Sequence, residues 1–315
     1  MKILVSDPLS NVGIEIFKNT PGIEVDVKTD LTPSELEDII DAYHGLSIRS
    51  KTKVTEQVIS KAKNLKVIGR AGIGLDNVDI PAATRANIAV MNTPFGNTIT
   101  TAEHAIAMIM ALSRNIPRAT ATLKDGEWEK KNLKGREIFN KTLGLVGIGN
   151  IGKIVADRAM GLKMKVIGCD PYLDPEAIEK MGIRPVNFDE ILAESDYISI
   201  HTPKTPETTN LFNKETLSRM KQGAMLINCA RGGLVNEDDL YEALKSNHLG
   251  GAALDVFETE PPGKIKLMDL DNFICSPHLG ASTHEAQDNV ARDVANQITE
   301  YLLTGKAPNI VNQKK

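Results

Sequence analysis

The stretch TLGLVGIGNIG, residues 142–152, decides the fold, because an apolar strand pattern runs directly into three glycines spaced G-x-G-x-x-G. The glycines are Gly147, Gly149 and Gly152, and a helical pattern over residues 151–162 follows them without a break. In such a turn the glycines permit a tight bend and a close approach of the backbone to a pyrophosphate, and the helix N-terminus attracts its negative charge. Strand, turn and helix together predict a dinucleotide-binding site.

Asp170 ends the next predicted strand, one helix and one strand after the glycine turn. A carboxylate at this place can accept hydrogen bonds from both ribose hydroxyls and repels the 2′-phosphate of NADP, so the sequence favours NAD as the cofactor. The alternative is a glycine-rich turn with an aspartate placed by chance. That alternative has to produce the glycine spacing, the strand, the helix and the acid together.

Short apolar strand patterns alternate with helical patterns along almost the whole chain, which is typical of an α/β protein with parallel sheets covered by helices. The strands are expected at residues 2–5, 23–27, 45–48, 66–68, 88–91, 142–146, 165–168, 197–200, 224–228, 251–254 and 273–275. Capping patterns indicate where several helices begin. Thr32 with Glu35, and Ser282 with Glu285, form capping-box patterns, and Asn236 precedes a run of acidic residues.

One helical pattern, over residues 99–123, is longer than the rest. The polar stretch 124–141 that follows it carries the only tryptophan, Trp128. This stretch is either a solvated surface loop or an arm that packs on a second subunit.

The composition describes a folded protein of 315 residues, 41% hydrophobic and 25% charged, with a formal net charge of −4. This length suits one large domain or two ordinary ones. The acidic balance argues against nucleic acid as the main partner, and the longest apolar run, residues 105–112, is too short to cross a membrane. Cys169, Cys229 and Cys275 lack CxxC spacing, and no acids or histidines show metal-ligand spacing. We therefore expect no disulfide framework, no metal site, and a place in the reducing cytoplasm.

Three polar residues, Arg231, Glu260 and His278, each follow a predicted strand, where open α/β sheets bind ligands. A guanidinium can bind a carboxylate through two hydrogen bonds, and a histidine can protonate a forming alkoxide or remove the proton in reverse. A carboxylate such as Glu260 would stabilise the imidazolium and orient the ring. Singly, each is more typical of a capped turn, an ion pair or a packed histidine; together, after the glycine turn, they predict hydride transfer. Among the other histidines, we expect His104 to pack in its helix, His201 to line the cofactor cleft, and His44, His248 and His284 to lie on the surface.

Several motifs of the chain resemble those of the D-isomer-specific 2-hydroxyacid dehydrogenase family, from about residue 2 to about residue 312. The motifs that carry the resemblance are GRAGIGLDNVD (69–79), VMNTP (90–94), GIGNIG (147–152), HTP (201–203), NCARGG (228–233), AALDVF (252–257) and PHLGAST (277–283). The resemblance implies two doubly wound lobes with parallel sheets. A Rossmann NAD-binding domain, residues 95–281, would be inserted into a flavodoxin-like substrate-binding domain formed by residues 1–94 and 282–315. It also implies a homodimer that assembles through the Rossmann domain.

The resemblance also implies which residues form the site. The catalytic positions fall on Arg231, Glu260 and His278. The cofactor contacts fall on Gly147, Gly149, Asn150, Ile151, Gly152, Asp170, Thr202, Cys229, Ala230, Asp255, His278, Gly280 and Ala281, where Asp255 would hold the nicotinamide carboxamide. The substrate contacts fall on Arg49, Arg70, Ala71, Gly72, Ile73, Asn97 and Arg231, and the backbone N–H groups of residues 71–73 would hold the substrate carboxylate. Ile73 stands where some relatives have threonine, so a side-chain hydrogen bond is lost there.

The substrate implied by the resemblance is a phosphorylated 2-hydroxy acid, 3-phospho-D-glycerate, with Arg49 and Arg70 at its phosphate and Lys130 and Lys131 reaching a neighbouring subunit. The first alternative is a glyoxylate or hydroxypyruvate reductase on the same scaffold; a formate dehydrogenase is less favoured, because formate has no hydroxyl proton. An NAD-sensing corepressor-like protein is the alternative that is not an enzyme. The sequence ends soon after Asn312, so we expect no C-terminal sensing domain and no feedback by serine through it.

Overall fold

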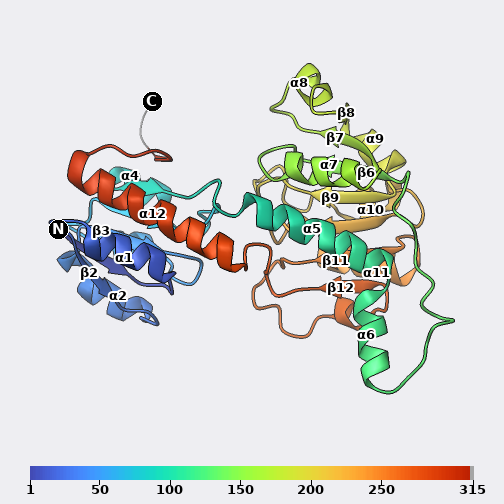
Figure 1. The fold of residues 1–315 in the computed structure, drawn as a ribbon, viewed down its shortest axis with the longest axis horizontal. Helices are drawn as coiled ribbons and strands as arrows, with labels where there is room; N and C mark the ends of the chain where they lie inside the picture. The colour runs from blue at the N-terminus through green and yellow to red at the C-terminus, as the bar shows by residue number, and fades with distance from the viewer. Residues whose placement is uncertain (313–315) are drawn as a thin grey trace. The chain divides into compact units, whose positions relative to one another are not determined.

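A computed structural model describes residues 1–312 and divides the chain into two compact units, which we describe one at a time (Figure 1). Unit 1 comprises Met1–Asn97 and the segment from Ser282 onward, and unit 2 comprises Thr98–Ala281. Each unit holds one parallel sheet with helices on both faces, so the predicted α/β class is confirmed. Among the described residues, no helix is long and apolar enough to cross a bilayer.

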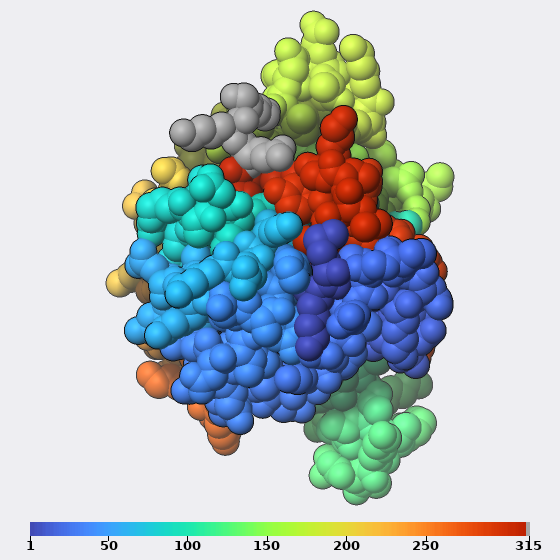
Figure 2. Space-filling view, turned by 90° about the vertical axis from the view of Figure 1, so that its left-hand side faces the viewer, coloured from blue at the N-terminus to red at the C-terminus, as the bar shows by residue number. Residues whose placement is uncertain are grey.

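The unit 1 sheet has the strand order β2-β1-β3-β4-β5, which is the flavodoxin-like order. Its strands are β1 (Lys2–Val5), β2 (Glu24–Val27), β3 (Gly45–Ile48), β4 (Val67–Arg70) and β5 (Ala89–Met91). One face packs on α2 (Pro33–Ile39), α3 (Glu56–Lys61) and α4 (Ile80–Arg85), and the other on α1 (Asn11–Asn19) and α12 (His284–Thr304). Figure 2 shows α12 in red beside the blue N-terminal part of the chain. A helix from the C-terminal end of the sequence thus packs on the N-terminal segment and completes unit 1.

The unit 2 sheet has seven strands in the order β12-β11-β10-β9-β6-β7-β8, which extends the Rossmann order. They are β6 (Thr142–Val146), β7 (Lys165–Cys169), β8 (Arg184–Pro185), β9 (Tyr197–Ile200), β10 (Met225–Asn228), β11 (Gly251–Leu254) and β12 (Phe273–Cys275). The helices are α5 (Thr98–Ser113), α6 (Ile116–Lys124), α7 (Gly152–Gly161), α8 (Pro175–Glu179), α9 (Phe188–Glu194), α10 (Lys214–Arg219) and α11 (Glu237–Lys245). Apolar side chains of α5 and α7 cover one face of the sheet, and those of α9, α10 and α11 cover the other.

The expected strands are all present with ends shifted by at most one or two residues, but β8 was not expected, because two residues carry no pattern. The single helix expected over residues 99–123 is wrong. The chain breaks at Asn115, whose φ is 54°, and Pro117 lies in the first turn of α6, where it has no N–H to continue the hydrogen bonds of α5. The carbonyl of Ser113 instead accepts a hydrogen bond from Arg136 N at 2.8 Å.

The helix starts expected at Thr32 and Asn236 are confirmed, because both side chains cap their helices. The start expected at Ser282 is wrong by one residue. Thr283 caps α12 there, and its hydroxyl accepts a hydrogen bond from Ala286 N at 3.2 Å.

Candidate active site

Six neighbouring strands of unit 2 end side by side, because their last residues are register partners across the sheet. In sheet order these residues are Cys169, Val146, Ile200, Asn228, Leu254 and Cys275. The residues that follow them are Asp170, Gly147, His201, Cys229, Asp255 and Ser276. Parallel pairing therefore brings the predicted cofactor and catalytic segments of this unit to a single carboxyl edge, where open α/β sheets bind ligands.

The glycine turn after β6 is shaped so that its middle faces open space. Gly147 has φ 93°, and a Cβ there would lie 2.7 Å from His201 O. A Cβ on Gly152 would press against Gly147 O, whereas one on Gly149 would meet nothing within 4 Å. The helix α7 begins at this turn without a side-chain cap on Ile151. The space beside Gly149 is open because glycine has no side chain, and it lies at an uncapped helix N-terminus. Such a site fits the pyrophosphate of a dinucleotide.

Asp170 ties the glycine turn to the end of β7. Its Oδ2 accepts a hydrogen bond from Ile148 N at 2.8 Å, and its Oδ1 accepts one from Tyr172 N at 2.9 Å. Each carboxylate oxygen has a second lone pair, so the half-buried carboxylate retains acceptors for ribose hydroxyls. The placement fits the predicted role.

His278 and Glu260 form a close pair. The Nδ1 atom of His278 lies 2.7 Å from Oε2 of Glu260, and the other oxygen, Oε1, accepts a hydrogen bond from Phe257 N at 3.1 Å. The side chains are 49% and 37% exposed, so the pair faces solvent at the edge of the sheet. Because the carboxylate accepts the Nδ1 proton, Nε2 is left with the lone pair that can take a proton from a ligand.

A buried carboxylate, Asp255, organises the turn that carries His278. Asp255 is 0% exposed and accepts hydrogen bonds from Ser276 Oγ at 2.6 Å, Leu279 N at 2.7 Å and Gly280 N at 2.8 Å. The N–H of His278 donates to the carbonyl of Asp255 at 2.9 Å, and the φ of His278 is 55°. Burial alone would raise the pKa of the Asp255 carboxyl, but the hydrogen bonds around it, beginning with the one from His104, hold the pKa below its usual value.

His104 belongs to this network, although the sequence indicated only a packed helix residue. Its Nε2 lies 3.0 Å from Ser276 Oγ and 3.3 Å from Asp255 Oδ1. A histidine directly before the apolar run of residues 105–112 was the available signal. Asp255 was expected to contact the nicotinamide carboxamide. Its carboxylate already accepts hydrogen bonds from several protein donors, so the carboxamide would have to share this acceptor with them.

His44 and His248, expected on the surface, are half-buried. Burial lowers the pKa of His201 to about 4.

Arg231 lies in a turn after β10 that Asn228 holds. The side chain of Asn228 donates to Arg231 O at 2.9 Å and accepts from Ala230 N at 3.0 Å. The Arg231 guanidinium donates to Ala230 O at 2.7 Å. Burial raises the pKa of the Cys229 thiol, so it stays protonated beside the turn. Thr202, Gly280 and Ala281, the other expected cofactor contacts, follow β9 and β12 at the same edge.

The expected substrate residues lie in unit 1. Arg70 ends β4 and is the register partner of Ile48, so Arg49 and Arg70 start from adjacent strand ends. The N–H groups expected to bind a carboxylate are placed differently. The N–H of Ala71 donates to Ile48 O at 2.9 Å, and that of Gly72 donates to Thr93 Oγ1 at 2.8 Å.

This arrangement corrects the expected donor set, since an N–H that is already bonded within the fold is not available to a ligand. Of the three donors, only Ile73 keeps its N–H outside the hydrogen bonds formed among residues 1–312. Asn97 is 9% exposed and is the last residue of the first segment of unit 1. Lys130 and Lys131 are exposed in the segment after α6.

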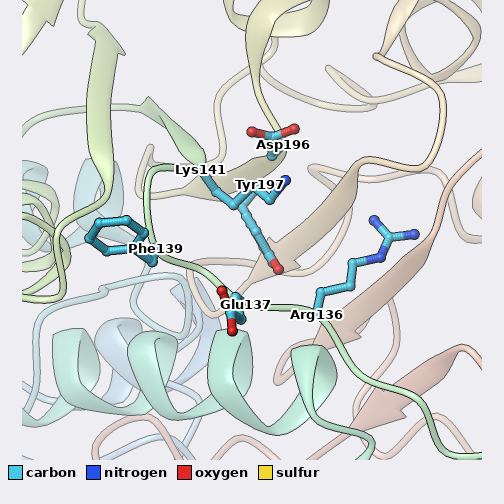
Figure 3. Close-up of a pocket in the computed structure, with 6 residues that line it drawn as sticks. All are labelled: Arg136, Glu137, Phe139, Lys141, Asp196 and Tyr197. Carbon is cyan, nitrogen blue, oxygen red and sulfur yellow. The ribbon is translucent and has the colours of Figure 1, made fainter.

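A cavity of about 490 Å³ lies at the opposite edge of the unit 2 sheet (Figure 3). Its lining residues are Arg136, Glu137, Phe139, Lys141, Asp196 and Tyr197. Lys141 precedes β6 and Tyr197 begins β9, so the cavity is at the amino ends of these strands. It is therefore not the predicted site.

Comparison with known proteins identifies relatives of the chain. Residues 106–280 match the family described as D-isomer specific 2-hydroxyacid dehydrogenase, NAD binding domain. The chain is 50% identical over 311 residues to the D-3-phosphoglycerate dehydrogenase of Synechocystis sp., covering 99% of this chain and 56% of that protein. It spans a little over half the length of the curated relatives it matches.

Two solved structures resemble it over all or nearly all of their length. The crystal structure of the TT0316 protein from Thermus thermophilus has a TM-score of 0.92 at 35% identity, covering 99% of this chain and 100% of that one. An NAD-dependent formate dehydrogenase from Staphylococcus aureus, in complex with NAD, has a TM-score of 0.85 at 32% identity, covering 100% and 97%.

Proposed function

The chain belongs to the D-isomer specific 2-hydroxyacid dehydrogenase family, and we propose that it uses NAD to oxidise 3-phospho-D-glycerate to 3-phosphohydroxypyruvate, the first step of serine biosynthesis. The 50% identity to a protein named D-3-phosphoglycerate dehydrogenase supports this choice of substrate. The observation that carries the proposed chemistry is the 2.7 Å contact between His278 and Glu260 at the edge that also holds the glycine turn.

In the proposed mechanism His278 is the base. Its Nε2 removes the proton of the substrate hydroxyl, while Glu260, bonded to Nδ1, stabilises the imidazolium that forms. Arg231 binds the carboxylate and polarises the oxygen that becomes the carbonyl. Bound NAD supplies the hydride acceptor for the carbon that carries the hydroxyl. In the reverse direction His278 returns the same proton, so one residue serves as acid and as base.

The cofactor is held, in this proposal, by the glycine turn and Asp170. The open face of Gly149 and the uncapped start of α7 receive the pyrophosphate, and the Asp170 carboxylate accepts the ribose hydroxyls. The same carboxylate would repel the extra phosphate of NADP, so we propose a preference for NAD.

Unit 1 supplies the proposed substrate-binding residues. Arg49 and Arg70 start from adjacent strand ends, and two guanidinium groups suit the charge of a phosphate. Ile73 would offer its backbone N–H to the substrate. Replacing Arg49 or Arg70 by alanine should raise KM for 3-phospho-D-glycerate, and an unchanged KM in both variants would remove these residues from the site.

We propose a second copy of the chain as the partner of α6 and the segment after it. None of the side chains of α6 is buried, and Ile116, Leu123 and Trp128 are 54%, 58% and 79% exposed. Large apolar side chains in such a segment are typical of an interface. Sedimentation of the wild-type chain should give a dimer and Trp128→Glu a larger monomer fraction. Three free thiols, Cys169, Cys229 and Cys275, support the proposed place in a reducing cytoplasm.

The experiment that tests the function measures formation of NADH with a panel of D-2-hydroxy acids, with and without a phosphate group. We expect 3-phospho-D-glycerate to give the highest kcat/KM. A higher value for glyoxylate or hydroxypyruvate reduction would favour the reductase alternative on the same scaffold. Binding of NAD without turnover of any of these acids would favour the NAD-sensing alternative.

A further inference from the structure

The loop from Arg49 to Thr52, which follows β3, is held from two sides by side chains of other segments. Asp7, which follows β1 and is 2% exposed, accepts hydrogen bonds from Arg49 N at 2.6 Å and from Thr52 N and Oγ1 at 3.1 and 2.8 Å. Asn77, from the loop after β4, donates through Nδ2 to the carbonyl oxygens of Arg49 and Thr52 at 2.7 and 2.6 Å. Both ends of the loop are therefore fixed to the sheet.

Arg49 is the cation that this loop presents. Its neighbour Lys51 forms an ion pair with Asp30. The Arg49 guanidinium, by contrast, forms no ion pair with any residue in the range 1–312. An arginine without an anionic partner, on a backbone held this firmly, is suited to receive an anion from outside the protein.

The position of the loop in the sheet strengthens this interpretation. The strand order of unit 1 reverses between β1 and β3, and Asp7 and Arg49 follow these two strands. The crevice outside the carboxyl ends of strands at such a reversal is where open α/β sheets bind their ligands. Arg70 starts from the adjacent end of β4, so a second guanidinium is close in the sheet.

We propose that Asp7 and Asn77 are positioning residues that hold Arg49 for the phosphate group of the substrate, an inference that rests on the function proposed above. Neither side chain has to touch the substrate, because each acts through the backbone of Arg49. A guanidinium discriminates a phosphate by the geometry of its donors, and a side chain with many rotamers delivers that geometry only from a fixed Cα. The pair therefore determines the preference for a phosphorylated over an unphosphorylated acid.

The test is steady-state kinetics of Asn77→Ala with two substrates, 3-phospho-D-glycerate and D-glycerate, which lacks the phosphate. Losing two hydrogen bonds should raise KM for the phosphorylated acid roughly tenfold, with kcat changed by less than about twofold. KM for D-glycerate and for NAD should stay the same. Asp7→Asn, which turns an acceptor into a donor, should give the same pattern and serves if Asn77→Ala folds poorly.

Two further variants sharpen the test. Asn64 also donates through Nδ2 to a backbone carbonyl, Asp41 O at 2.9 Å, but it precedes β4 at the amino edge of the same sheet. Asn64→Ala is therefore a matched control that should leave both KM values unchanged. Adding Asn77→Ala to Arg49→Ala should raise KM for 3-phospho-D-glycerate by less than about twofold more, because the guanidinium that Asn77 positions is already absent.

The proposal would be overturned by equal rises in KM for both acids. It would also be overturned if the rise in KM of the double variant equalled the product of the rises in Arg49→Ala and Asn77→Ala. Failure of the proposed function is visible in the wild-type chain alone, as no NADH from 3-phospho-D-glycerate. In that event hydrogen exchange of the Arg49 and Thr52 amides and phosphorus NMR titration with inorganic phosphate decide. Faster exchange and weaker phosphate binding in Asn77→Ala and Asp7→Asn, but not in Asn64→Ala, support the positioning role; unchanged values refute it.

Discussion

At the carboxyl edge of the unit 2 sheet the glycine turn leaves its backbone open to a ligand, whereas at the same edge of unit 1 two of the three expected backbone donors are bonded within the fold. A Cβ on Gly149 would meet open space, while the N–H groups of Ala71 and Gly72 already donate to Ile48 and Thr93. Unit 2 can therefore bind an anion with backbone groups and a helix end. In unit 1 the proposed binding groups are mainly side chains, those of Arg49 and Arg70, and Ile73 contributes the one expected backbone N–H that is not bonded within the fold.

The two edges also share a device. Each has one buried carboxylate, Asp255 or Asp7, that accepts hydrogen bonds from backbone N–H groups of the loop carrying a functional side chain. The loop that Asp255 holds carries His278, and the loop that Asp7 holds carries Arg49. In the proposed site, the residues assigned to proton transfer and to the phosphate, His278 and Arg49, are therefore positioned by other residues in both units.

The largest effect is expected at His278, the only proposed base at either edge. Replacing it by glutamine keeps a polar side chain but removes the proton acceptor, and kcat should fall by roughly a thousandfold or more. The Tm should change little, because the side chain of His278 is 49% exposed. A variant that retains more than about a tenth of the wild-type kcat would contradict the assignment.

A substitution in the glycine turn tests whether the open backbone of unit 2 binds the cofactor. Gly149→Val places its side chain in the space assigned to the pyrophosphate, so the Kd for NADH should rise by about a hundredfold with an almost unchanged Tm. In Gly152→Ala the new Cβ presses against Gly147 O, so this matched variant should lower Tm instead. Equal effects of both substitutions on Tm would refute the open cradle.

The burial of His201 at the carboxyl edge of unit 2 should make the free energy of unfolding depend on pH in the acid range. Burial lowers its pKa to about 4 in the folded protein, against an ordinary value of 6.5. Between pH 6.5 and 4 the unfolded chain binds a proton that the folded chain does not, so stability falls as the pH falls. From pH 7 to 4.5 this group should cost about 2 kcal/mol of unfolding free energy. Urea unfolding of His201→Gln should show a loss on acidification that is smaller by this amount.

A smaller effect is expected when Glu260 is replaced by glutamine. The amide can still contact Nδ1 of His278 but carries no charge to stabilise the imidazolium, so kcat should fall roughly tenfold, about 1.4 kcal/mol. KM for NAD should remain as in the wild type. A kcat equal to that of the wild type would place the acid–base work on His278 alone.

The α/β class, the glycine turn and most strand positions could be predicted because they rest on local patterns: apolar runs, glycine spacing and caps such as Thr32. The break at Asn115 was missed although Pro117 was visible, since the apolar pattern continues across it. His104 was assigned to packing because nothing near it in sequence shows that Asp255 and Ser276 lie within hydrogen-bond range.

The sequence by itself determined which residues are proposed for hydride transfer, since Arg231, Glu260 and His278 are recognisable by type, motif and position after strands. Only the tertiary structure decided how they are held. Parallel pairing sets six strand ends in line, and buried carboxylates then accept backbone N–H groups from loops distant in the chain. Such hydrogen bonds join residues with no periodic relation in sequence. They can therefore be identified only from the folded sheets and not from a sequence pattern.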